Sequence, residues 1–210
     1  MIPEKQRYEN LEKFTPDVAG RYDIPVIKAD KVNFSDFIGF NYAKSCKKCE
    51  GRAVHFFLDD YQFFRVWNYP RDYVSLLSRF SCVLSPDFSL YTDFPVAMQI
   101  YNHYRKHWLG AYWQSLGIKV IPTICWSDER SFDWCFDGEP AGGVVAVSSV
   151  GTQNSRTAKA AFLRGYEAMC ERLCPSEIIF YGSVPDECRG NIIHVKSFQD
   201  KFREARTNGW

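Results

Sequence analysis

Apolar and polar positions alternate in blocks along this chain, and the same order of blocks recurs. Short apolar runs each end in polar or acidic residues, as in VHFFL, CVLS, KVIPTICW, GVVAV and EIIFY. A segment with apolar residues at helical spacing follows most of these runs. Strands that alternate with helices in this way usually build a mostly parallel sheet, so the pattern predicts an α/β fold.

The same pattern predicts where the elements lie. Residues 1–20 are expected to form an arm or a loose helix, and 21–210 a single α/β domain. The segment 34–50 is expected to be a helix or an irregular connection. Strands are expected at 24–28, 54–58, 82–85, 119–125, 144–148, 178–181 and 191–195. Helices are expected at 70–80, 94–116, 128–136, 155–174 and 198–206.

Two architectures fit this alternation: a small or incomplete TIM-like barrel, and an open doubly wound sheet. With its 210 residues the chain lies near the lower size limit of a (β/α)₈ barrel. Polar residues follow almost every predicted strand, whereas an open sheet would concentrate them at one switch point. The sequence therefore favours the barrel-like form.

Composition narrows the choice of partner and location. The chain carries 26 basic and 25 acidic side chains, so no global charge favours nucleic acid or an anionic membrane. No apolar run approaches the roughly 20 residues of a spanning helix, so no membrane partner is expected. The polar start, MIPEKQRYENLEKF, does not resemble a signal peptide, and a cytoplasmic location with reduced cysteines is expected.

Four aspartates at predicted strand ends are the candidate catalytic residues. Asp59 and Asp60 follow VHFFL, Asp87 follows CVLS, and Asp128 follows KVIPTICW. If Asp87 and Asp128 converge with Asp59, or with Asp60 in its place, their oxygens would suit Mg²⁺ or Mn²⁺. Without a cation, such close carboxylates would raise at least one pKa. The alternative is that these residues cap strands and helices.

The segment SSVGTQNS at 148–155 is the candidate substrate loop. Its backbone N–H groups and the following helix N-terminus would suit a phosphate, but the segment is neither a Walker A motif nor GxGxxG. Ordinary turn chemistry is the alternative. The candidate substrate-binding residues are Arg65 as a charge clamp, Trp126, Ser148, Ser149 and Gly151.

Two further motifs carry weaker signals. YNHYRKHW at 101–108 interleaves aromatic and basic residues, which suits single-stranded nucleic acid. An ordinary amphipathic helix with its aromatics inward and its charges outward explains the segment better. Cys46 and Cys49 form a CxxC pair without a second pair, which disfavours structural zinc, and the strand-then-helix context of a redox pair is missing.

Several long stretches resemble a known family: VHFFLDDYQFFRVWNYP, VLSPDFSLYTDFPVAMQIYNHYRKHWLGAYWQSLGIKVIPTICW, SFDWCFDG and NIIHV. It is a domain family of unknown function found in bacterial, phage and mobile-element proteins. The resemblance covers residues 35–196. It implies a phage- or plasmid-borne role, such as nucleotide or nucleic-acid processing, replication support or countering host defence. It carries over no activity or cofactor.

Three functions follow as hypotheses. The first is a divalent-metal-dependent enzyme that hydrolyses a nucleotide or nucleic-acid phosphate at the strand carboxyl ends. The second is a non-catalytic binding protein, such as a partner or inhibitor of a host protein, with Trp108 and Trp113 in its interface. Burial of both tryptophans would count against this second hypothesis. The third is a protein that sequesters a small nucleotide without turnover.

Overall fold

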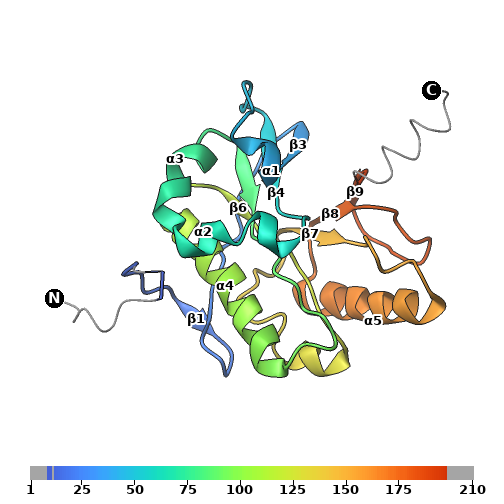
Figure 1. The fold of residues 1–210 in the computed structure, drawn as a ribbon. Helices are drawn as coiled ribbons and strands as arrows, with labels where there is room; N and C mark the ends of the chain where they lie inside the picture. Colours follow the sequence, from blue (N-terminus) through green and yellow to red (C-terminus); the bar gives the residue numbers. More distant parts are fainter. Residues whose placement is uncertain (1–8, 11, 198–210) are drawn as a thin grey trace, which may run out of the picture.

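The computed structural model describes residues 9–10 and 12–197, and it is a mixed α/β fold with mostly parallel sheets (Figure 1). One sheet has the order β3-β4-β5-β6, and a second has the order β7-β8-β9; all neighbours within them are parallel. The strands are β3 (Asp36–Gly39), β4 (Arg52–His55), β5 (Cys82–Leu84), β6 (Val120–Ile121), β7 (Val144–Ser148), β8 (Glu177–Tyr181) and β9 (Ile192–Val195).

The order of these strands follows the order of the chain, without the reversal of a doubly wound sheet. A single parallel bridge between Thr123 and Ala146 connects the two sheets beyond the end of β6. In the part of the chain that the structure describes, no pairing joins β9 back to β3, so the barrel is not closed.

The sheets curve around a shared interior. One apolar cluster collects side chains from β4 through β8, and the ring of His55 at the end of β4 lies 4.9 Å from that of Tyr181 at the end of β8. Three strands separate β4 from β8 in the order, so this contact requires strong curvature. The buried members of the cluster are Ala53, Cys82, Leu84, Ile121, Ala146 and Ile179.

Helices cover the outside of the sheets (Figure 1). Helix α4 (Val96–Ser115) packs against the β3–β6 half, and α5 (Arg156–Leu173) against the β7–β9 half. Ser155 caps α5 by accepting a hydrogen bond from the amide of Ala158. Shorter elements are α1 (Phe40–Ala43), α2 (Arg65–Asn68), α3 (Val74–Leu77), and the 3₁₀ helices η2 (Asp60–Gln62), η3 (Pro70–Tyr73) and η4 (Glu129–Asp133).

Several predicted elements differ from the observed ones. The segment 34–50, expected to lack a strand, contains β3, a four-residue strand at the edge of its sheet. The strand expected at 119–125 shortens to β6, since Pro122 has no N–H to donate to the ladder. The strand expected at 24–28 is β2 (Ile24–Pro25), which pairs antiparallel with β1 (Val18–Ala19). The helices expected at 70–80 and 128–136 are short helical turns, and 198–206 lies outside the described residues.

The orientation expected for α4 is wrong. Its side chains His103, Lys106 and His107 are fully buried and Arg105 is nearly so, whereas they were expected on an outer face. The helix is covered on both sides, because β2 and the residues after it also pack against it. Gly110 shows how close this contact is: a Cβ there would lie 2.5 Å from the side chain of Ile27.

Two further expectations concern the chain as a whole. All eight cysteines are free thiols, as expected. The helices within the described residues are too short or too polar to cross a membrane.

The arm expected at 1–20 lies partly outside the described residues, and within it Phe14 packs edge-on against the rings of Trp108 and Tyr112.

Candidate functional site

A cavity of about 840 Å³ lies where the parallel strands end. This volume falls within the range of small-molecule sites, roughly 300–1,000 Å³. All seven parallel strands contribute to its wall at, or a few residues after, their carboxyl ends. The residues that represent the strands in order are Gly39, His55, Asp87, Trp126, Ser148, Tyr181 and Val195.

The wall of the cavity combines flat rings with hydrogen-bonding groups. The ring of Phe57 is stacked on that of Tyr181 with centroids 4.8 Å apart. The polar lining includes the amides of Asn41 and Gln62 and the cationic side chain of Lys196. Flat rings beside amides and a cation suit a planar polar ligand that carries negative charge.

Asp87 is the carboxyl group whose surroundings change its chemistry most within this wall. Burial raises the pKa of Asp87 to about 7; Lys106 and a hydrogen bond from Cys125 act in the lowering direction, and Asp60 in the raising direction. A carboxyl group that titrates near neutral pH can both accept and donate a proton under physiological conditions. Asp87 is therefore suited to acid–base chemistry on a ligand in the cavity.

Asp59 and Asp60 face different surroundings although they are adjacent in sequence. Asp59 is exposed and lines the cavity. Asp60 instead accepts hydrogen bonds from the hydroxyl of Ser89, at 2.8 Å, and from its amide. Asp60 thus ties the loop after β4 to the loop after β5.

Asp128 is engaged away from the cavity. It caps η4 by accepting a hydrogen bond from the amide of Arg130, and it pairs with that guanidinium at 2.6 Å. The hydrogen bond with Arg130 lowers the pKa of Asp128. Of the three aspartates expected to share a cation, two line the cavity, Asp59 and Asp87, and the third does not.

Of the candidate substrate-binding residues, some line the cavity and others do not. Trp126 and Ser148 line the cavity, and the Trp126 indole packs on the backbone of Gly165 in α5. Ser149 is buried and donates its hydroxyl proton to the carbonyl of Ser183. Gly151 lies in the turn before α5 with φ +81°, and Arg65 lies over the ring of Phe40; neither lines the cavity.

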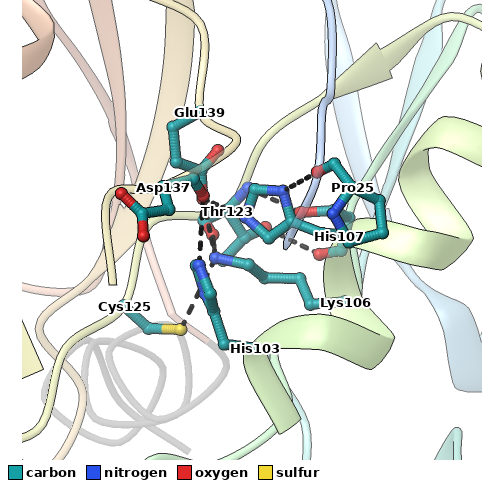
Figure 2. Close-up of polar contacts among 9 residues, drawn as sticks. Pro25, His103, Lys106, His107, Thr123, Cys125, Asp137 and Glu139 are labelled. Carbon is teal, nitrogen blue, oxygen red and sulfur yellow. Dashed lines mark hydrogen bonds and ion pairs between the residues drawn. The ribbon is translucent and has the colours of Figure 1, made fainter. Parts of the chain in front are cut away.

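Behind the cavity wall lies a buried polar network on α4 (Figure 2). The Lys106 ammonium donates to the carbonyl of Thr123 at 2.8 Å and to Glu139 Oε1 at 2.7 Å, and it lies 3.9 Å from the sulfur of Cys125. The Lys106 and Glu139 side chains are 1% and 0% exposed. Cys125 lines the cavity, so this ion pair lies directly behind its wall.

His107 completes the network through both of its ring nitrogens. Nδ1 lies 2.8 Å from the carbonyl of Pro25, which can only accept, so this nitrogen donates. Nε2 lies 2.8 Å from Glu139 Oε1, and this contact therefore holds one shared proton. Burial acts to raise the pKa of Glu139, but His107 and Lys106 outweigh it and the pKa is lowered.

This network also bears on metal binding. Within the described part of the chain, the His, Cys, Asp and Glu donors close enough to share an ion belong to His103, His107 and Glu139. The Lys106 ammonium already contacts the Glu139 carboxylate, so it holds the position of positive charge that a metal ion would otherwise take. Sequence reasoning missed it, although positions 103, 106 and 107 fall on one helical face, which is the available signal.

The fold and the cavity define an α/β protein with a ligand-sized site at the carboxyl ends of parallel strands. Residues 16–199 match the family described as a domain of unknown function, DUF4417, and the chain belongs to this family. The family resemblance expected from the sequence is thereby confirmed.

Two phage proteins are similar to this chain. It is 35% identical over 213 residues to the Gene 1 protein of Mycobacterium phage D29, covering 99% of this chain and 78% of that protein. It is 45% identical over 134 residues to the Gene 1 protein of Mycobacterium phage L5, covering 64% of this chain and 58% of that protein. No solved structure matches the chain.

Proposed function

We propose that this protein binds a nucleotide, or another small phosphorylated ligand, in the cavity and that Asp87 transfers a proton in a hydrolytic reaction on it. The observation that carries the proposal is a carboxyl group with a pKa of about 7 in the wall of a ligand-sized cavity. A general acid or base works best when its pKa lies near the working pH. Asp87 has this property because of burial.

The rest of the lining supports the ligand class. A nucleobase is flat and carries donors and acceptors on its edge, which suits Phe57 and Tyr181 together with the amides of Asn41 and Gln62. Lys196 would interact with a phosphate. Ser148 and Trp126 belong to the same wall, whereas Gly151 itself does not, so the proposal does not depend on Gly151.

A divalent cation is part of this proposal. Asp59 lines the same cavity as Asp87, and a carboxylate together with phosphate oxygens are ligands that Mg²⁺ and Mn²⁺ prefer. In this proposal Asp59 and the phosphate hold the cation and Asp87 does not, because a cation bound to Asp87 would lower the pKa on which its proton transfer depends. The cation would neutralise charge on the phosphate during hydrolysis. Asp128 has no part in it, because Arg130 already occupies its carboxylate.

The test compares Asp87→Asn with Asp93→Asn, an exposed aspartate on the same loop that does not line the cavity. Nucleoside monophosphates and triphosphates would be screened by calorimetry for binding and by phosphate release for turnover, with Mg²⁺ and with EDTA. Asp87→Asn is expected to bind the ligand and to lose about 100-fold or more in kcat. Asp93→Asn is expected to match the wild type.

Turnover by Asp87→Asn at the wild-type rate would refute the role of Asp87. Binding by both proteins without turnover by either would instead identify a protein that sequesters its ligand. Failure of every nucleotide to bind at millimolar concentration would refute the ligand class.

A protein interface is the second candidate function. Trp108 and Trp113, the interface residues expected from the sequence, are fully buried and cannot contact a partner. Tyr61, Phe64 and Tyr69 around α2 are exposed instead, by 79%, 40% and 62%. Aromatic residues dominate interface energetics, so Tyr61→Ala and Tyr69→Ala should weaken capture of any partner, while Asp87→Asn should not.

A further inference from the structure

The loop between α1 and β4 brings the two thiols of the CxxC pair together. The chain bends at Lys47, and the sulfur of Cys49 donates a hydrogen bond to the carbonyl of Cys46 at 3.5 Å. The two side chains also share a hydrogen bond, which together with burial raises the pKa of Cys49. Sulfur atoms within hydrogen-bond reach on adjoining turns of chain need little movement to form a disulfide.

The surroundings of the two sulfur atoms differ. The Arg52 guanidinium donates to the sulfur of Cys46 at 3.3 Å, and Arg79 donates to the carbonyl of the same residue at 2.8 Å. A guanidinium beside a sulfur atom favours the thiolate, which is the reactive form. The Cys49 sulfur instead donates to a backbone carbonyl, and burial raises the pKa of this thiol although the charges of Arg79 and Arg52 act in the opposite direction. This asymmetry makes Cys46 the attacking group and Cys49 the resolving group.

Access separates this pair from the other buried cysteines. Cys46 and Cys49 each keep 7% of their surface exposed, on a surface loop between exposed lysines. Cys82 and Cys135 are fully buried inside the fold, and burial raises the pKa of each thiol to about 12. Those two thiols are therefore protonated and shielded, and they serve as internal references.

We propose that Cys46 and Cys49 are a redox-active dithiol that a low-molecular-weight disulfide, such as oxidised glutathione, converts to an intrachain disulfide. The Cys46 thiolate attacks one sulfur of the external disulfide, forming a mixed disulfide and releasing one thiol. Cys49 then attacks the Cys46 sulfur and releases the second thiol. The two protein thiols lose two electrons and two protons, and the external disulfide gains them as two thiols. The proposal is independent of what the cavity binds.

The test uses the full chain, reduced and then equilibrated with defined ratios of reduced and oxidised glutathione. Free thiols are alkylated, and the peptides are mapped by mass spectrometry without reduction. A reversible Cys46–Cys49 disulfide is expected, with Cys82 and Cys135 alkylated only after unfolding. Cys49→Ser should stop at glutathione bound to Cys46, and Cys46→Ser should not react at this loop.

The contribution of Arg52 is tested by rate. Arg52→Met removes the guanidinium that donates to the Cys46 sulfur and so stabilises negative charge on the attacking atom, and this variant should react about threefold more slowly. Arg79→Met, which removes a nearby charge without touching the sulfur, should react at nearly the wild-type rate. The zinc content of the purified protein is measured as a second readout, because it distinguishes a redox pair from a metal site.

Three results would overturn the proposal: no Cys46–Cys49 disulfide under excess oxidised glutathione, glutathione trapped on Cys49 in preference to Cys46, or one zinc ion per pair. The last result would make the pair a metal site completed by further ligands. Cys82 reacts at the rate of Cys46 only in an unfolded sample. The wild-type melting curve, measured alongside, shows whether the protein was folded under the conditions of the reaction.

Discussion

Replacing Lys106 by Met removes the charge from the buried network and keeps most of the side-chain volume. The ammonium is 1% exposed and lies 2.7 Å from Glu139 Oε1. Its loss leaves the carbonyl of Thr123 without this donor and leaves Glu139 with His107 as its remaining hydrogen-bond partner. Removing one member of a buried ion pair typically destabilises a protein by about 3–5 kcal/mol.

We expect the lower end of this range, about 3 kcal/mol, because Glu139 Oε1 still shares a proton with His107 Nε2. With a urea m-value of about 2 kcal/mol per M, the unfolding midpoint should fall by about 1.5 M. The matched control is Lys159→Met. Lys159 pairs with Glu187 at the same 2.7 Å, but the side chains are 36% and 51% exposed, so its loss should change the midpoint far less.

The assay is equilibrium urea unfolding, followed by fluorescence and circular dichroism, for the wild type, both single variants and a double-mutant cycle. Glu139→Gln leaves the Lys106 ammonium buried without its anion, so it should also be costly. The double variant Lys106→Met/Glu139→Gln should lose less than the sum of the two single losses by at least about 1 kcal/mol. Additive losses, or a Lys106→Met cost no larger than that of Lys159→Met, would refute the burial argument.

Three further predictions concern the walls of the cavity. Because burial raises the pKa of Asp87 to about 7 from 3.8, its protonated form contributes stability that is complete below about pH 4 and lost as pH rises through 7. Asp87→Asn should therefore raise Tm more at pH 8 than at pH 5, and equal shifts at both pH values would contradict this. Gly165→Ala should destabilise by about 1–3 kcal/mol in urea unfolding, since the new Cβ collides with the Trp126 indole; a gain, as helix propensity alone predicts, would contradict it. Asp60→Ala should cost about 1–3 kcal/mol by freeing the amide and hydroxyl of Ser89, and unchanged hydrogen exchange at that amide would count against the tie between the two loops.

Local sequence patterns were sufficient to predict the helices and strands that are marked by an apolar run, a helix cap or a proline. The strand at β7 was predicted with its observed bounds, because four apolar residues, Val144 to Val147, lead into polar serines. Helix α5 was predicted nearly as well, because Ser155 caps one end and Pro175 follows the other. β3 was missed because a four-residue edge strand is too short for its alternation to stand out.

The sequence predicted where in the fold the candidate site lies, but not which side-chain contacts it contains. Parallel strands present their carboxyl ends at one edge, so polar residues after the strands had to gather there, and Asp59, Asp87, Trp126 and Ser148 line the cavity. Which neighbour each side chain meets was not predictable. Asp128 pairs with Arg130, only two residues further along the chain. This local ion pair competes with the cation site that Asp128 was expected to share.

The sequence by itself determined the α/β alternation, the parallel connections and the end of the sheet at which polar residues collect, because these depend on periodicity and on short-range caps. Tertiary structure decided which charges are buried. The face of α4 with Lys106 and His107 has the polarity of a solvated surface, and only the packing of β2 and the approach of Glu139 cover it. Such partners lie 33 and 82 residues away in the sequence, beyond the reach of any local pattern.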